Sequence, residues 1–192
     1  MLRCAKMAAI AAVSVAAALA GVSCGNPQSN PLVEAVKAKV AETVKGNAAD
    51  VRINSIELID SSALGPELSR CKDLFSLKIK RETELYDKYL GNGQRSAAQA
   101  KRAVIAKAQQ NYEGIEALEQ RLAASKDSII AYHYRLAGRA RNADGGSVIF
   151  NEAYVAVTPD GRVLTLVTDR RDLGKVVRHA IPGYMELLGA EE

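Results

Sequence analysis

Two periods of hydrophobic residues divide this 192-residue chain. From about residue 31 to residue 124, apolar side chains mostly recur every three or four positions, which is typical of helices that bury one face. Residues 51–60 interrupt this pattern with a run of β-branched side chains that indicates a strand. From Asp127 onward the period falls to two, which is typical of half-buried strands. The pattern therefore predicts a mainly helical first part and a sheet-forming second part.

Three helices are expected in the first part. The first covers residues 31–44, with Asn30 as its N-cap, Pro31 at its first position and Gly46 as its stop. Residues 64–90 and 95–124 are expected to form two longer helices, which fold back on each other as an antiparallel hairpin because only residues 91–94, with the breaker Gly91-Asn92-Gly93, separate them. A continuous apolar stripe is expected to bury one face of the first of these two helices: Leu68, Cys71, Phe75, Ile79, Tyr86 and Leu90.

Four strands are expected, separated by turns of clear chemistry. In residues 51–60 the apolar positions change face, which indicates either a bulge near Asn54-Ser55 or a strand buried on both sides. Residues 130–139, 148–158 and 163–168 then form a meander, with turns at residues 142–146 and 158–162. In the second of these strands, Phe150 and Tyr154 are expected on one face.

This order of elements predicts an α+β domain. An antiparallel sheet of about four strands is expected to pack against helices on one of its faces. The long two-helix hairpin lies between the first strand and a C-terminal three-strand meander.

The first 24 residues have a different pattern. Arg3 and Lys6 precede an uncharged apolar run, Met7 to Ala20, which is shorter than the roughly 20 residues that a spanning helix needs. A positive start followed by such a run is typical of a secretory signal peptide. The next four residues, Gly21-Val22-Ser23-Cys24, resemble the lipobox of bacterial lipoproteins, although Gly21 stands where that family usually has Leu.

The lipobox resemblance implies a membrane anchor. In that family the cysteine is lipidated on sulfur and becomes the mature N-terminus, so Cys24 would carry the lipid. The chain is then expected to comprise a signal peptide (1–23), a lipidated Cys24 with a short polar tether (24–30) and a single domain (31–192). With Gly25 rather than Asp directly after the cysteine, the chain resembles lipoproteins that are passed to the outer membrane. Ala18-Leu19-Ala20 offers an alternative cut by ordinary signal peptidase, which would leave a soluble periplasmic protein.

The charge and the cysteines that remain after the signal is removed limit the partners and bonds that can be expected. Two of the 26 basic residues and none of the 22 acidic residues lie in the signal, so the formal charge falls from +4 to +2 when it is removed. That small charge does not favour nucleic acid, which an exported protein would not meet. Cys4 leaves with the signal and Cys24 would carry lipid. The remaining Cys71 is therefore expected to be a free, buried side chain.

Motifs for catalysis, cofactors and metals are not found. The two histidines, His133 and His179, lie on separate elements and are expected on the solvated surface, so no metal site is predicted. Neither a nucleophile elbow nor a Gly-rich phosphate loop is present, so no catalytic residue and no cofactor are predicted.

One basic constellation stands out as a candidate anion-binding site. Its members are His133, Arg135, Arg139 and Arg141, with Arg162, Arg170 and Arg171 farther along. Strand alternation places the first three on one face, where an arginine can bind a carboxylate or phosphate through two hydrogen bonds. The alternative is a wet strand face kept soluble by charge.

The segment after the signal also resembles a group of small lipoproteins of unknown function from Gram-negative bacteria. The resemblance rests on a helical hairpin followed by Ile130-Ala131-Tyr132-His133-Tyr134-Arg135, a Gly-containing turn at residues 142–146, and Thr158-Pro159-Asp160-Gly161. It implies an α+β fold and an envelope location. The expected function is a non-enzymatic binding or assembly role, with membrane lipid and an envelope protein as partners. The alternatives are a small anionic-ligand-binding domain and, more distantly, an enzyme of unfamiliar type.

Overall fold

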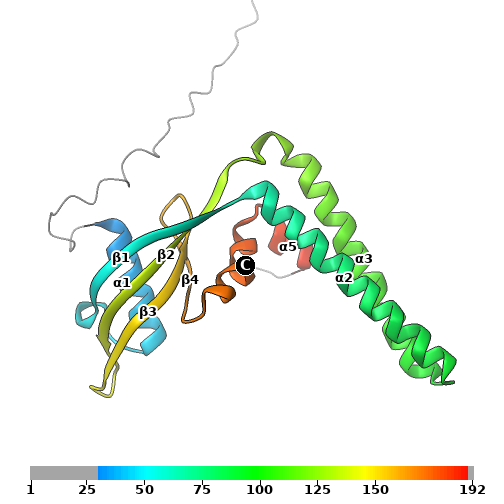
Figure 1. Ribbon diagram of the computed structural model, residues 1–192, viewed down its shortest axis with the longest axis horizontal. Coiled ribbons are helices and arrows are strands. Elements are labelled where there is room, and N and C mark those ends of the chain that lie inside the picture. Colours follow the sequence, from blue (N-terminus) through cyan, green and yellow to red (C-terminus); the bar gives the residue numbers. More distant parts are fainter. Residues whose placement is uncertain (1–29, 190–192) are drawn as a thin grey trace, which may run out of the picture.

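The computed structural model describes residues 30–189. The expected signal peptide, Cys24 and the tether up to residue 29 lie outside these residues. Figure 1 shows a curved sheet at one end of the molecule and a long pair of helices projecting from it. The α+β prediction is confirmed, including the four-strand antiparallel sheet and the helical hairpin after the first strand.

The sheet has the strand order β1-β2-β3-β4, with every neighbouring pair antiparallel. The strands are β1 (Arg52–Ala63), β2 (Ile129–Arg141), β3 (Ser147–Val157) and β4 (Val163–Val167). The register of β1 against β2 shifts between Ile53 and Ser55, which confirms the predicted bulge. A further shift in the β2–β3 ladder turns Phe150 and Tyr154 toward different hydrophobic clusters, so the expectation that they share a face is wrong.

Helix α1 (Pro31–Val44) has the predicted bounds, but its C-cap is a different residue from the one predicted. The Asn30 side chain accepts from the Leu32 amide at 3.0 Å, and Pro31 occupies the first position, as predicted. At the other end Lys45, rather than Gly46, takes the left-handed conformation with φ 53°. Gly46 is required for a different reason, because a Cβ there would lie 2.0 Å from the Arg141 carbonyl oxygen.

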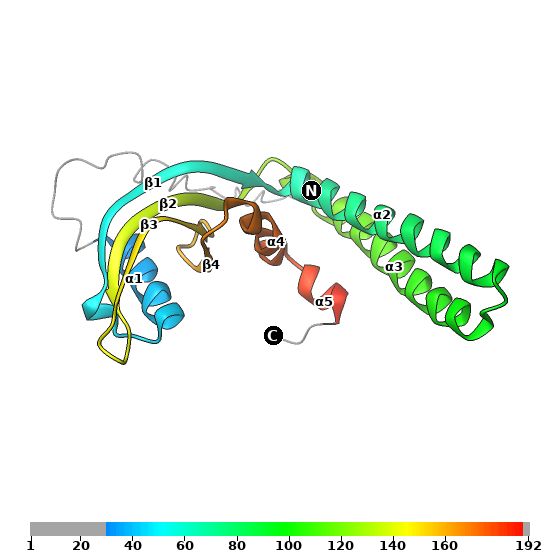
Figure 2. The same ribbon diagram turned by 60° about the horizontal axis from the view of Figure 1, so that its bottom comes forward.

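The helical hairpin consists of α2 (Leu64–Gly91) and α3 (Arg95–Arg121), which continue the β1–β2 ladder out of the sheet (Figure 2). No side chain caps the start of α2. Instead the Leu64 and Gly65 amides donate to the carbonyls of Ser128 and Lys126 in the returning segment, at 2.9 and 2.8 Å. The hairpin and the sheet are therefore joined by backbone hydrogen bonds as well as by two chain connections.

Burial along α2 is much less continuous than predicted. Leu68 and Cys71 are buried, but beyond Cys71 no residue of α2 is. Leu90 is 51% exposed, which corrects the expectation of a stripe buried along the whole helix. Ala98 and Ala108 are buried in the facing helix, and two ion pairs cross the hairpin, Lys101–Glu82 at 2.7 Å and Lys72–Glu119 at 2.6 Å.

Short elements complete the chain after the sheet. They are the 3-10 turns η3 (Ala48–Asp50), η4 (Ala123–Ser125), η5 (Arg170–Asp172) and η6 (Arg178–Ala180), and the helices α4 (Leu173–Val177) and α5 (Tyr184–Leu188). Helix α5 packs against α3, where a Cβ at Gly114 would lie 2.0 Å from Leu187. The C-terminal segment therefore closes against the base of the hairpin.

Two hydrophobic clusters hold these parts together. The junction core joins the base of the hairpin to α4, α5 and one end of the sheet, and contains Leu64, Leu68, Cys71, Ile115, Leu118, Ile130, Ala131, Ala156, Leu173, Val177, Ile181 and Tyr184. The sheet core lies between α1 and the sheet, and includes Val36, Val40, Leu136, Ala140, Val155 and Val157.

The two cores lie on opposite faces of the sheet. Ala156 belongs to the junction core, whereas its neighbours Val155 and Val157 belong to the sheet core. Successive residues of a strand point to opposite faces, so helices cover both faces along β3. The expectation of helices on one face is therefore wrong.

Candidate functional site

The predicted basic strand face does not form one site. His133, Arg135 and Arg139 do share one side of β2 by alternation, but their surroundings differ. His133 is buried beside the start of α2, Arg135 is exposed in a shallow cavity, and Arg139 and Arg141 lie exposed near the β2–β3 turn. Of the more distant arginines, Arg170 pairs with Asp60 at 3.3 Å, Arg171 pairs with Asp169, and Arg162 lies exposed in the β3–β4 turn.

His133 belongs to a buried polar cluster with Ser62 and Glu67. The Ser62 hydroxyl donates to Glu67 Oε1 at 3.0 Å and lies 3.3 Å from His133 Nε2. Because the hydroxyl proton is directed to Glu67, Nε2 carries a proton and donates to Ser62. Burial lowers the pKa of His133, although Asp60 and Glu67 oppose that shift. The solvated position expected for His133 is wrong, whereas His179 is exposed and stacks on Tyr184.

The Ser62–His133 contact does not have the properties of a nucleophile and its base. Ser62 is 5% exposed and His133 8%, so neither atom is open to a substrate. The serine proton is held by a carboxylate rather than by the imidazole. The cluster instead satisfies polar groups at the point where β1 enters α2.

Arg135 lines a shallow cavity of about 370 Å³ between β1, β2 and β3. Its Nη2 lies 2.6 Å from Glu57 Oε2, and this hydrogen bond raises the pKa of Arg135. Glu152 lines the same cavity and accepts from the Tyr154 hydroxyl. Two carboxylates therefore surround one guanidinium, which disfavours an anion at this position.

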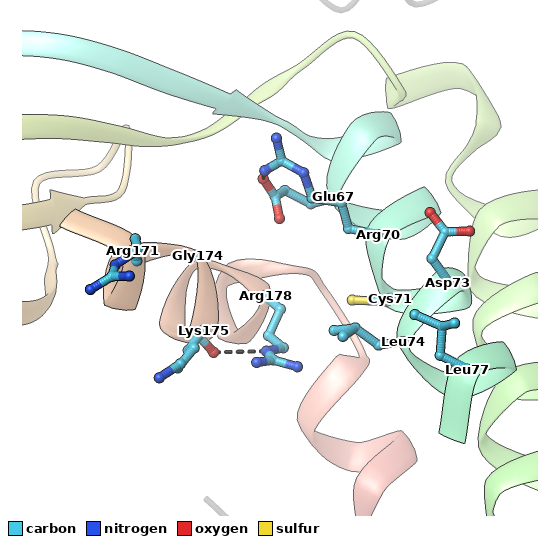
Figure 3. A pocket seen from close by; sticks show the side chains of 10 residues that line it. All are labelled: Glu67, Arg70, Cys71, Asp73, Leu74, Leu77, Arg171, Gly174, Lys175 and Arg178. Carbon is cyan, nitrogen blue, oxygen red and sulfur yellow. Dashed lines mark hydrogen bonds and ion pairs between the residues drawn. The ribbon is translucent and has the colours of Figure 1, made fainter. Parts of the chain in front are cut away.

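A second cavity, of about 450 Å³, lies between α2 and the segment from η5 to η6 (Figure 3). We call it the hairpin groove, and its lining is Glu67, Arg70, Cys71, Asp73, Leu74, Leu77, Arg171, Gly174, Lys175 and Arg178. Cys71 and Leu74 point from α2 toward the facing segment, where the Arg178 side chain lies with its guanidinium against the Lys175 carbonyl. Leu74 and Leu77 are 50% and 64% exposed, so the floor of the groove is apolar and open.

The charged residues around the hairpin groove differ in how fully they are neutralised. Arg70 pairs with the buried Glu67, and Lys175 pairs with Asp172 at 2.6 Å. Arg171 donates to Asp169 from its side chain and its backbone, which lowers the pKa of Asp169 to about 2. Arg178 donates through Nε to the Lys175 carbonyl at 2.7 Å.

Arg178 is the cation available to a ligand in this groove. Within residues 30–189 it forms no ion pair with a carboxylate, in contrast to Arg70, Arg171 and Lys175. The Cys71 thiol beside it stays in its neutral form, because burial raises its pKa and outweighs the opposing effect of Arg178. The groove thus combines an apolar floor with one guanidinium that lacks an acidic partner.

This groove was not predicted from the residue pattern. Leu74 and Leu77 lie off the predicted apolar stripe of α2, and Arg178 is about a hundred residues farther along the chain. The available signal was the pair of leucines on the polar side of a helix, since such side chains need a partner or remain open to solvent.

From Asn30 to Gly189, no three or more His, Cys, Asp and Glu side chains are placed to hold a metal ion. In the same range, no helix combines the length and apolar character needed to cross a membrane.

Comparison with known proteins adds no relative. No protein-family model, no curated protein and no solved structure matches the chain.

Proposed function

We propose that this chain is a lipid-anchored envelope lipoprotein with a non-enzymatic binding role. The resemblance of Gly21-Val22-Ser23-Cys24 to the lipobox supports the anchor, and Gly25 favours the outer membrane over the inner. Two acyl chains on sulfur would hold the protein firmly, because each buried methylene contributes about 0.8 kcal/mol. The tether of six residues, 25–30, reaches at most about 20 Å, so the domain would stay near the membrane.

The hairpin groove is the observation that carries the binding role. Its volume of about 450 Å³ lies in the usual range of small-molecule sites. The open leucine floor suits an apolar chain, and the unneutralised Arg178 suits an acidic head group. An amphiphile with a carboxylate or similar anionic group is therefore the ligand class that fits best. The hairpin groove is a better candidate than the cavity around Arg135, because the Arg135 guanidinium already forms an ion pair with Glu57.

Binding to the groove is testable with an anionic apolar dye, anilinonaphthalene sulfonate, and with dodecanoate as a competitor. Dye bound in the groove should fluoresce and be displaced by dodecanoate. Leu77→Glu should weaken binding by at least about tenfold, because a carboxylate on the floor removes apolar contact and repels the head group. Arg178→Gln should weaken binding of both anions.

The matched control for this experiment is Leu90→Glu. It makes the same substitution at another exposed leucine of α2, far from the groove. Equal dye binding by the Leu77 and Leu90 variants would show that the groove is not the site. If uncharged dodecanol displaced the dye as strongly as dodecanoate does, Arg178 would not contribute to ligand binding.

The anchor has its own test. The intact mass of protein extracted from membranes should show a chain that begins at Cys24 with a diacylglyceryl group on sulfur, and Cys24→Ser should release the protein. An unmodified chain beginning at Gly21, removed from membranes by salt, would establish the soluble periplasmic alternative.

A further inference from the structure

The β2–β3 turn lies at the end of the sheet farthest from the tip of the hairpin (Figures 1 and 2). Four exposed residues lie on the strands at this end. We call this group the arginine patch, and it consists of Arg52, Arg139, Arg141 and Ile149. In the strand register, Arg139 lies opposite Arg52 on one side and opposite Ile149 on the other, and all three face the same way. Arg141 lies two residues beyond Arg139 on the same strand face. This end of the sheet therefore presents a row of Arg52, Arg139 and Ile149 across three strands, with Arg141 beside it.

The arginine patch carries charge that the fold does not neutralise. Of the ion pairs formed within residues 30–189, none includes Arg52, Arg139 or Arg141. Asp50 and Asp144 lie nearby in the chain, yet neither forms one. Like charges directly opposite each other on neighbouring strands destabilise a sheet, as Arg52 and Arg139 are here. An anion outside the domain would relieve this repulsion.

Ile149 narrows the choice of anion. It is 71% exposed, the highest value among the large hydrophobic side chains of the described chain. Arginines in a row that ends in a projecting apolar side chain suit an anionic bilayer, where the arginines meet phosphates and the apolar tip enters the headgroup layer. A stable protein partner usually needs about 800 Å² on each side, far more than four side chains at one end of a sheet provide.

The position of the patch is compatible with an anchor at Cys24. Ala140 belongs to the sheet core under α1, so Arg139 and Arg141 lie on the face of the sheet away from that helix. Packed layers are about 10 Å apart. The end of α1, rather than its start, adjoins the β2–β3 turn, because the Ala143 amide donates to the Lys45 carbonyl at 2.9 Å. The start of α1 lies about 21 Å farther along this 14-residue helix. A tether of about 20 Å therefore reaches the bilayer when the arginine-bearing face of the sheet, rather than its end, lies on the membrane.

We propose that the arginine patch is a docking surface for an anionic lipid bilayer. This inference rests on the proposed lipid anchor for its orientation, but the patch itself is formed by residues of the folded domain. The bilayer contact would hold the domain in one orientation and leave the hairpin projecting along or away from the membrane.

The chain contains no tryptophan, so one introduced tryptophan reports on a single place. The full-length protein with Ile149→Trp is reconstituted into vesicles of phosphatidylcholine alone or of equal parts phosphatidylcholine and phosphatidylglycerol. On the anionic vesicles the emission should shift to the blue, and brominated lipid should quench it. On the neutral vesicles both effects should be weak. Salt at about 1 M should reverse them, because it shortens the screening length to about 3 Å.

Two matched variants separate specific contact from general charge. Arg139→Gln with Arg141→Gln, in the Ile149→Trp background, should weaken the contact by roughly 30-fold, since each arginine near an anionic surface contributes about fivefold. Arg81→Gln with Lys88→Gln removes the same charge from exposed positions of α2 and should leave quenching intact. Leu90→Trp, near the tip of the hairpin, should remain unquenched on both vesicles.

Failure of the docking surface is distinguishable from failure of the anchor. An unlipidated chain would still bind the anionic vesicles through the patch and would sediment with them in a salt-sensitive manner. Quenching at residue 149 that is equal on both vesicles, or that survives Arg139→Gln with Arg141→Gln, would overturn the proposal. So would a lipidated chain in which residue 149 stays exposed to water on anionic vesicles.

Discussion

The uneven burial of α2 leads to a quantitative prediction about the helical hairpin. Leu68 is 1% exposed and lies in the junction core, whereas Leu90 on the same helix is 51% exposed. Leu68→Ala removes buried methyl groups and leaves a cavity, so the free energy of unfolding should fall by about 3–5 kcal/mol. Leu90→Ala makes the same chemical change near the tip and should cost less than about 0.5 kcal/mol.

Urea unfolding followed by circular dichroism measures both variants. With a denaturant slope of about 2 kcal/mol per M, Leu68→Ala should lower the midpoint by about 1.5–2.5 M, and Leu90→Ala by less than about 0.3 M. The slope itself should not change, because neither variant alters the surface exposed on unfolding.

The same difference should be visible in hydrogen exchange. Amides near the tip of the hairpin should exchange through local opening, whereas those around Leu68 should exchange only through global unfolding. If Leu90→Ala lowered the free energy of unfolding as much as Leu68→Ala does, this reasoning would be refuted. Such a result would mean that the outer half of the hairpin is buried by contacts absent from the described chain.

Three other predictions concern single residues. Burial lowers the pKa of His133 below its usual 6.5, so on acidification this side chain is protonated in the unfolded chain before it is protonated in the folded one. The free energy of unfolding should therefore decline as the pH falls below about 6.5. Urea midpoints measure this decline, and His133→Gln should reduce it. A pH-independent midpoint in this range would contradict this prediction. Gly46→Ala places a Cβ 2.0 Å from the Arg141 carbonyl oxygen and should lower the free energy of unfolding, measured in urea, by about 1–3 kcal/mol. Gly91 has open space around it, so Gly91→Ala should not lower that free energy. Cys71 is 2% exposed, so thiol reagents should modify it only after unfolding; rapid labelling of the native chain would show that the base of the hairpin opens.

Much of the fold could be predicted from the sequence because it depends on neighbours within a few residues. The helical period, Asn30 as a cap, the glycine-containing turns and the bulge after Ile53 all follow from local stereochemistry. Gly46 shows where such reasoning stops. A glycine after a helix predicts a left-handed stop, yet Lys45 adopts that conformation, and Gly46 is needed because β2 passes close by.

The candidate sites were less predictable, since they depend on which elements meet. Alternation along β2 correctly placed His133 and the arginines on one side of the strand. Only the position of α2 decided that His133 would be buried and Arg135 exposed. Likewise, Glu57 reaches Arg135 across the β1–β2 ladder, and it is this contact that neutralises the guanidinium.

The helices and strands, their order and the antiparallel hairpin follow from residue patterns along the chain, which also contain the motif for the proposed anchor at Cys24. The tertiary structure decided which faces are covered and which charges stay unneutralised. Arg178 and Leu74 form one groove only because the C-terminal segment folds back against the base of the hairpin. The difference lies in the range of the interactions, because backbone conformation follows from adjacent residues, whereas burial and charge pairing follow from contacts between segments far apart in the chain.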